Sequence, residues 1–105
     1  MDKVMSLLGF GRRARRVLSG EEGIRRAVLR RRARLLVVAE DASPQSRAMY
    51  QRLARAGGVS CTIYGRKEEL GRALGTSARS AVAILDAGLA SAVVQEIGRR
   101  SGGEE

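Results

Sequence analysis

Two short runs made only of apolar residues limit the folds that are open to this chain. They are residues 35–39 (LLVVA) and residues 81–85 (AVAIL). A continuous apolar run of this length, rather than an alternating one, is typical of a strand whose two faces are both covered. We therefore expect a sheet with helices packed on both of its faces.

Segments with helical periodicity alternate with these runs. Helices are expected at about residues 2–15, 20–32, 44–56, 67–74 and 87–99, and further strands at 17–18 and 59–64. The second helix should bury Ile24, Ala27 and Val28, and the third Met49, Leu53 and Ala56. The alternation predicts a three-layer α/β/α sandwich with a small central sheet, largely parallel or mixed. A chain of 105 residues is long enough for one core, so we expect a single domain at residues 1–100 and a flexible tail at 101–105.

Two helix starts carry capping signals. Ser19 is expected to cap the second helix, with Glu22 reaching back to the cap backbone in a capping box. Ser43 is expected to cap the third helix, with Pro44 in its first position, where a missing N–H costs little.

The composition excludes several classes of site. The chain has no histidine and one cysteine, which rules out an internal disulfide, a cysteine-cluster metal site and a histidine general base. Cys61 is interpreted as a small core residue. Glu40, Asp41 and Asp86 follow strands, where α/β enzymes place catalytic groups, but cap and loop roles are commoner. No base, nucleophile and second acid fall together, so we predict no enzyme activity, no metal, no cofactor and no small-molecule substrate.

The positive charge is concentrated in the first third of the chain. The net charge is +9, and residues 1–34 carry eleven Lys or Arg against three acids, or +8. Such a field favours a polyanion as partner. An anionic membrane surface is the competing polyanion, but no long helix pairs a basic face with a bulky aromatic one. The N-terminal charges follow the apolar residues, the reverse of a secretory signal, so a cytoplasmic protein is expected.

The stretch SGEEG, residues 19–23, has two interpretations. It is either a plain helix cap or a helix start that presents its free N–H groups and dipole to a ligand. Glu21 and Glu22 would then accept hydrogen bonds from base edges, while basic residues outside the apolar stripe would neutralise phosphates. Those basic residues are Arg25, Arg26 and Arg30.

The run RRRAR, residues 30–34, is equally open to two interpretations, a solvated helix end or a set of phosphate contacts. The chain has only three aromatic residues, too few for a single-strand binder based on stacking, so a folded RNA is the expected target.

Three segments in this order resemble the ribosomal protein L7Ae/L30e superfamily, and its small bacterial, YlxQ-type branch in particular. They are SGEEGIRRAVLRRRARLLVVAEDASP, GGVSCTIYGRKEELGRALG and AVAILDAGLA, and the resemblance covers about residues 3–98. It implies an α/β/α sandwich and binding of kink-turns, which are sharply bent RNA helices with tandem sheared G·A pairs. Members of this family that bind kink-turns start their second helix with Gly-x-Asn-Glu and have a Lys three residues after the Glu.

Laid on this chain, the Gly is Gly20, and Glu22, Gly23 and Arg26 stand where the family has Asn, Glu and Lys. The resemblance also implies that the loop at residues 76–81, with Arg79 and Ser80, covers the RNA. Because Gly23 offers no side chain, we predict weaker and less selective binding than in the family pattern.

The hypothesis from the sequence is a non-enzymatic protein that binds structured RNA, ribosomal or kink-turn, as a ribosome-associated or assembly protein. Ribosomal, transcription or translation proteins would be further partners. The alternative is a protein-interaction module that keeps the fold but has lost specific RNA binding. The predicted RNA-binding residues are Gly20, Glu21, Glu22, Gly23, Arg25, Arg26, Arg30, Arg79 and Ser80.

Overall fold

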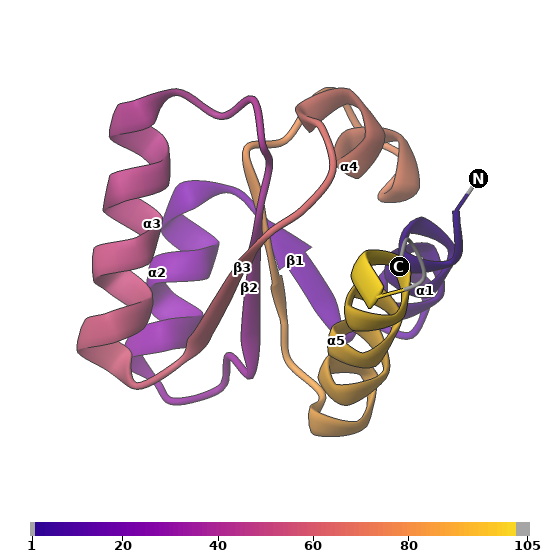
Figure 1. Cartoon of the computed structure of the whole chain (residues 1–105). Helices are drawn as coiled ribbons and strands as arrows, with labels where there is room; N and C mark the ends of the chain where they lie inside the picture. Colours follow the sequence, from indigo (N-terminus) through magenta and orange to yellow (C-terminus); the bar gives the residue numbers. More distant parts are fainter. Residues whose placement is uncertain (1, 103–105) are drawn as a thin grey trace.

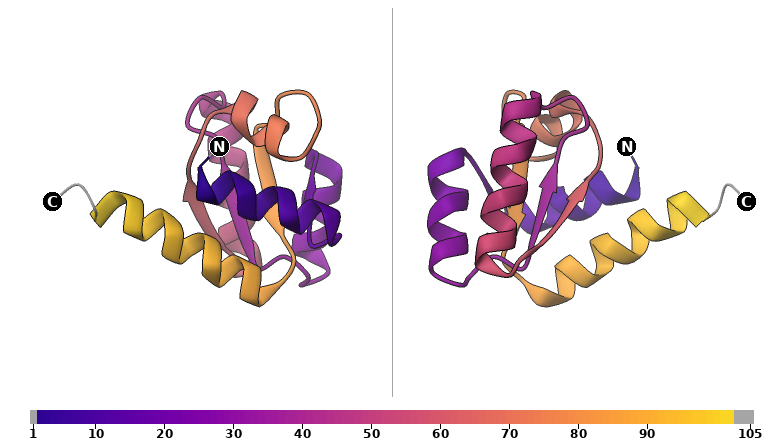
Figure 2. Two further views of the ribbon diagram at one scale, coloured as in Figure 1. Left: turned by 90° about the vertical axis from the view of Figure 1, so that its right-hand side faces the viewer. Right: turned by 60° about the vertical axis from the view of Figure 1, so that its left-hand side comes forward.

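The computed structural model describes residues 2–102 of the chain, as five helices and a four-stranded sheet (Figure 1). In chain order these are α1 (Lys3–Arg13), β1 (Val17–Ser19), α2 (Glu21–Leu29), β2 (Leu35–Val38), α3 (Pro44–Gly57), β3 (Ser60–Ile63), α4 (Lys67–Ala73), β4 (Ala81–Ile84) and α5 (Ala87–Gly102). Helices α2 and α3 cover one face of the sheet, and α1, α4 and α5 lie on the other (Figures 1 and 2). The three-layer α/β/α sandwich is confirmed.

The sheet is mixed, with strand order β1-β4-β2-β3. Only the β2–β3 pair is parallel, and β4 runs antiparallel to both of its neighbours, so of the two expected forms, largely parallel or mixed, the sheet has the mixed one. The reason is the short connection between β3 and β4. Helix α4 has seven residues and remains at the end of the sheet where β3 finishes, so the chain enters β4 from that same end (Figure 1).

The core consists of the two apolar runs and the helix faces packed on them. Every residue of β2 and β4 is buried, as predicted. Helix α2 buries Ile24, Ala27 and Val28, also as predicted.

The inward face predicted for helix α3 is right only in part. Its buried residues are Tyr50 and Ala54, whereas Met49 and Leu53 are partly buried and Ala56 is exposed. The helix packs against α2 as well as against β2 and β3. Its line of closest contact therefore follows the i, i+4 pair 50 and 54, rotated from the predicted stripe.

Several helix ends also differ from the sequence prediction. Helix α2 ends at Leu29 rather than at residue 32, because Arg31 takes a left-handed backbone conformation with φ 58°. Helix α5 continues to Gly102, beyond the predicted end at residue 99 and into the predicted tail. The rest of that tail, residues 103–105, lies outside the described residues. Ser43 caps α3 as predicted, and its hydroxyl accepts a hydrogen bond from the Ser46 backbone N–H at 3.1 Å.

Candidate nucleic-acid interface

The turn between β1 and α2 is made at Gly20. Ser19 is still paired with Val82 in the sheet, so it does not cap α2, and Gly20 takes the cap position without a side-chain hydrogen bond. The predicted capping box of Ser19 and Glu22 is therefore wrong. Gly20 has φ 97° and ψ 135°, a conformation almost restricted to glycine. A Cβ built on it would meet nothing within 4 Å, so the backbone conformation, not lack of space, requires glycine.

This glycine leaves the start of α2 open to a ligand. The first N–H groups of any α-helix have no acceptor within the helix. A capping side chain usually supplies one, and Gly20 has none. A partner can therefore approach these N–H groups closely and accept hydrogen bonds from them.

Arg25 is turned toward α3 and is partly neutralised. Its guanidinium forms an ion pair with Glu21, one turn earlier, at 3.1 Å, and also lies 3.9 Å from Met49 Sδ. Burial, and then the charge of Glu21, raises the pKa of the nearby Tyr50 hydroxyl. Glu21 and Arg25 thus belong to the contact between α2 and α3, and their predicted roles toward RNA compete with this ion pair.

The side chains that remain on the outer face of α2 are Glu22, Arg26 and Arg30, all exposed. They line an open hollow of the surface together with Glu21, Arg25 and Leu29. Leu29 is also exposed, with 71% of its surface accessible to solvent. The outer face therefore combines one free carboxylate, two arginines and one apolar side chain.

Gly23 lies at the contact between α2 and β1. A Cβ added to it would lie 3.4 Å from Leu18 Cδ1, an ordinary contact, so a larger residue fits there. Gly23 helps to line a second, smaller hollow, of about 90 Å³, with residues of β1, α2 and the chain after it. The others in that hollow are Leu18, Arg26, Ala27, Arg30, Arg32 and Leu85.

The loop before β4 is fixed at both ends. The Arg79 N–H donates to the Lys67 carbonyl at 3.0 Å, and the Ala39 N–H donates to the Ser80 carbonyl at 2.8 Å. At its start, Thr76 N–H donates to the Gly71 carbonyl at 2.8 Å, and the Ser77 carbonyl occupies the space where a Cβ of Gly71 would be. The loop is thus held against α4 in one position.

The fold brings the start of α2 and this loop to the same end of the sheet. Because β1 and β4 are antiparallel with Ser19 opposite Val82, Gly20 and Ser80 both lie just beyond the paired residues at that end (Figure 1). We call the proximal site the set of Gly20, Glu22, Gly23, Arg79 and Ser80 at this end, together with Arg26 and Arg30, which lie further along α2. These are the predicted residues other than Glu21 and Arg25, which form the ion pair described above.

Arg47 on α3 is a residue that the sequence did not single out. It and Arg79 each have a buried Nε without a hydrogen-bond partner among the described residues. Arg47 lies in the first turn of α3 and Arg79 in the loop before β4, and both segments are at the proximal end of the sheet (Figure 1). No spacing in the sequence marks Arg47, since it sits among polar residues of an ordinary capped helix.

Two of the three acids that follow strands, Asp41 and Asp86, have structural roles. Asp41 accepts a hydrogen bond from the Lys67 N–H at 2.8 Å and pairs with Arg66, and these contacts hold its pKa below the usual range. Asp86 accepts from the Leu89 N–H at 2.8 Å and so caps α5, as the sequence predicted.

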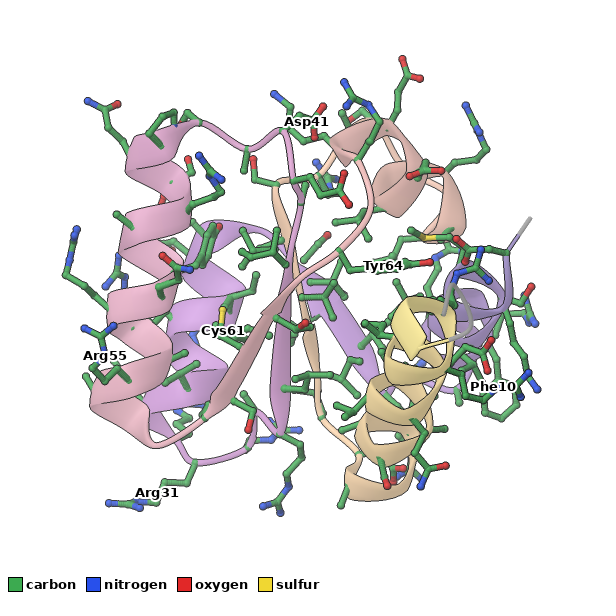
Figure 3. The ribbon with its side chains drawn as sticks, viewed as in Figure 1. Phe10, Arg31, Asp41, Arg55, Cys61 and Tyr64 are labelled. Atoms are coloured by element: carbon green, nitrogen blue, oxygen red, sulfur yellow. The ribbon has the colours of Figure 1, made fainter. Side chains whose placement is uncertain are left out.

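Cys61 is half-buried on β3, and burial raises the pKa of its thiol, the opposite of what a reactive cysteine needs. Figure 3 shows Asp41 and Arg31 at opposite ends of the sheet.

In the part of the chain described, no three His, Cys, Asp or Glu side chains group as metal ligands. No helix within residues 2–102 has the length and apolar character needed to cross a membrane.

Residues 2–94 match the model of the Ribosomal protein L7Ae/L30e/S12e/Gadd45 family. The chain belongs to this family. One relative, the RNA-binding protein YlxQ of Bacillus subtilis, is 33% identical over 88 residues, which cover 84% of this chain and 88% of the relative. The Large ribosomal subunit protein eL8 of Haloquadratum walsbyi is 34% identical over 98 residues, covering 91% of this chain and 82% of the relative.

Solved structures of similar fold agree with this assignment. A protein of unknown function from Bacillus halodurans C superposes with a TM-score of 0.88 at 28% identity, over 93% of this chain and 99% of the other. The Giardia lamblia 15.5kD RNA binding protein gives a TM-score of 0.74 at 23% identity, over 94% and 88% of the two chains. The resemblance found in the sequence is thus confirmed at the level of family and fold.

Proposed function

We propose that this protein binds structured RNA at the proximal site and acts in the cytoplasm as a ribosome-associated or assembly protein, without catalysis. The observation that carries the proposal is the convergence of the open start of α2 and the fixed loop with Arg79 at one end of the sheet. Relatives whose names state RNA binding or a place in the ribosome support it.

The chemistry divides between two kinds of group. Gly20 lets a nucleotide approach the first N–H groups of α2, and Glu22 accepts hydrogen bonds from the donors of a guanine edge. Arg26 and Arg30 neutralise phosphates, and Arg79 and Ser80 lie against the RNA from the other side. Since Gly23 carries no side chain where the family pattern has Glu, part of the base reading is lost while the phosphate contacts remain.

The test is a titration onto a generic kink-turn RNA and onto the same duplex with its G·A pairs replaced. Binding to both should fall steeply with salt, by about 0.7 to 0.9 units of log–log slope for each phosphate contacted. Arg26→Ala should weaken binding to both RNAs and lower the slope by about one unit. Arg52→Ala, an exposed arginine on α3, is the matched control and should change neither.

Kink-turn preference can be tested by restoring the family pattern. The double variant Glu22→Asn, Gly23→Glu is sterically allowed, because the Cβ at residue 23 makes only an ordinary contact with Leu18. If the proximal site is a weakened kink-turn reader, this variant should prefer the kinked RNA more strongly than the wild type does. Equal binding of both RNAs by the variant would argue against kink-turn recognition here.

A second function is favoured by one surface. A hollow between the C-terminal ends of α2 and α3 is lined by Val28, the exposed Leu29 and Leu53, with arginines at its rim. A protein-interaction module with no RNA role would use such a face. Co-purification with and without ribonuclease separates the two functions, because a partner retained after RNA digestion, together with failure of the purified protein to bind folded RNA, would favour this alternative.

A further inference from the structure

Five exposed arginines gather at the end of the molecule opposite the proximal site. They come from the turn after α1 and from the segment between α2 and β2, and with Leu85 they line one hollow of about 340 Å³. We call them the distal arginine cluster. Its members are Arg15, Arg16, Arg31, Arg32 and Arg34.

Backbone hydrogen bonds hold the three segments that build this cluster. The Arg34 N–H donates to the Ile84 carbonyl at 2.7 Å, and the Leu85 N–H donates to the Arg16 carbonyl at 2.7 Å. The Arg32 N–H donates to the Ala27 carbonyl at 2.8 Å, which ties the segment to the end of α2. The arginines are therefore brought together by the fold, although residues 15 and 34 are far apart in sequence.

Two of these arginines occupy backbone conformations that favour glycine. Arg15 has φ 60° and Arg31 has φ 58°, and each follows the last turn of a helix, the position where glycine is commonest. The chain thus carries a charged side chain at two places where glycine would relieve backbone strain. The strain says nothing by itself about a ligand, but it offers substitutions that remove charge without harming the fold.

The cluster carries little compensating charge. Among the side chains described, its one ion pair joins Arg16 to Asp86 at 3.0 Å, and both partners are exposed to solvent. Four guanidinium groups are left without an ion-pair partner in that part of the chain. An arrangement of like charges held this close is stabilised by an anion with several negative groups.

The cluster is continuous with the proximal site. Arg32 lines both the distal hollow and the smaller hollow that contains Gly23, Arg26 and Arg30. A row of arginines therefore runs from Arg26, in the second half of α2, through Arg30 to Arg32, beyond the end of the helix.

We propose that the distal arginine cluster is a second phosphate-binding surface, which holds a duplex arm of the RNA whose bent segment lies at the proximal site. The inference rests on the proposed RNA binding and adds a place for the RNA beyond the bend. The guanidinium fork matches phosphate in a bidentate geometry, and the repeated charges of a duplex backbone match a row of arginines.

An RNA arm fits this surface better than a membrane or an acidic protein. The single apolar residue that lines the distal hollow is the half-buried Leu85, so an apolar wedge for lipid is lacking there. A protein partner would normally find an apolar centre within a polar rim, and this hollow has arginine throughout.

The test uses the full chain with Arg15→Gly and Arg31→Gly combined. Glycine suits both backbone conformations, so the melting temperature should be unchanged or slightly higher. The control removes the same charge elsewhere, with Arg52→Ala and Arg72→Ala on α3 and α4. The probes are a kink-turn RNA with short arms and two versions in which one arm or the other is longer by a helical turn.

Wild type should bind one of the long-armed RNAs roughly 3- to 10-fold more tightly than the short one, with a steeper salt dependence. The glycine variant should lose that gain and up to about two units of slope, while it binds the short-armed RNA as wild type does. The control pair should behave as wild type on all three RNAs.

The outcomes separate this inference from the proposed function. If wild type binds none of the RNAs, the proposed function fails and the inference fails with it. If wild type prefers a long arm and the glycine variant keeps that preference, RNA binding stands, but the proposal that the distal arginine cluster holds the arm is wrong. If wild type shows no preference for a long arm, or if the variant loses only its affinity for anionic phosphatidylserine vesicles, the arm proposal is likewise overturned.

Discussion

A residue with positive φ flanks each end of α2, but the two residues differ in type. Before the helix, Gly20 has φ 97°, and after it Arg31 has φ 58°. The first conformation, with ψ 135°, is open almost only to glycine, so the proximal end has no side chain there and presents backbone. The second is the left-handed helical region, which other residues enter at a moderate cost, so the distal end keeps an arginine.

In the proposed function, this difference gives α2 two modes of recognition. The proximal end has free N–H groups, a carboxylate and a loop held in one position, features suited to reading a particular shape. The distal end has guanidinium groups on a fixed backbone, a feature suited to neutralising any phosphate. Changes at the proximal end should therefore alter which RNA is bound, and changes at the distal end should alter how binding depends on salt.

The largest effect is expected for Gly71→Ala, which should damage the proximal end and spare the distal one. The new Cβ would overlap the Ser77 carbonyl, so the loop that carries Arg79 must move. The free energy of unfolding should fall by about 1–3 kcal/mol, measured by denaturant titration, and kink-turn binding should weaken with it.

Gly98→Ala on α5 is the control for that variant. Gly98 is exposed, and a Cβ there meets nothing within 4 Å. Alanine should raise stability by about 0.5–1 kcal/mol, since glycine disfavours a helix interior. A Gly71→Ala protein as stable as wild type would show that the loop yields easily, and would weaken the distinction between a shaped end and a charged one.

Gly20→Ala comes next, with an expected loss of roughly 1–3 kcal/mol in the free energy of unfolding. Space is available for the Cβ, so the cost arises from the backbone conformation alone. If the chain relieves this strain by shifting the start of α2, the preference for kinked over straight RNA should decrease. The control is Gly58→Ala, at the end of α3, which also has positive φ and open space around its Cβ but lies outside the proximal site. It should lower stability without changing the RNA preference.

The roles of the two ends in RNA binding can be compared directly with two variants, Arg26→Ala and the combined Arg15→Gly, Arg31→Gly. Arg26 is exposed, so its removal should change stability by no more than about 0.5 kcal/mol. It should weaken the binding of every RNA that reaches the proximal site, whereas the distal pair should matter only for RNA with a long arm. Fluorescence titrations over a range of salt concentrations measure both effects. The same loss on short-armed and long-armed RNA in both variants would remove the distinction between the two ends.

The sequence predicted those features of the fold that follow from local pattern. The apolar runs at residues 35–39 and 81–85 became the two central strands because they need burial on both faces, and the family resemblance followed from motifs in order. The direction of β4 was not predictable in this way, since it depends on α4 remaining at one end of the sheet. The inward face of α3 was predicted only in part, because the elements it packs against, α2 and two strands, were unknown.

The candidate site, too, was predictable only where local sequence pattern determines it. The exposure of Arg26 and Arg30 followed from helical periodicity. The ion pair of Glu21 with Arg25 could have been found from their i, i+4 spacing, which favours such pairs. The proximity of Arg16 and Arg34 could not have been found from the sequence, because it requires the pairing of β1 and β2 with β4. Long-range pairing is what brings the distal cluster together.

The smallest effect on RNA binding is expected for Tyr64→Phe, which tests whether loss of stability alone weakens that binding. The Tyr64 hydroxyl donates to Asp2 Oδ2 at 2.9 Å, in neither of the two surfaces (Figure 3). Its removal should cost about 1 kcal/mol in the free energy of unfolding at neutral pH and leave RNA binding unchanged. Weaker RNA binding by this variant would mean that the effects of Gly71→Ala and Gly20→Ala reflect general destabilisation and not the shape of the proximal end.

Alkaline titration adds an independent readout for Tyr64. Burial, and then the hydrogen bond to Asp2, raises its pKa from an ordinary value of 10.0 to about 12. The folded state therefore favours the protonated hydroxyl, and this stabilisation is fully present below pH 10 and is lost between pH 10 and 12. The difference in stability between wild type and Tyr64→Phe should shrink across that range. A constant difference would show that the hydroxyl is not held as the structure describes, and Tyr64→Phe would then no longer serve as the reference for the two ends of α2.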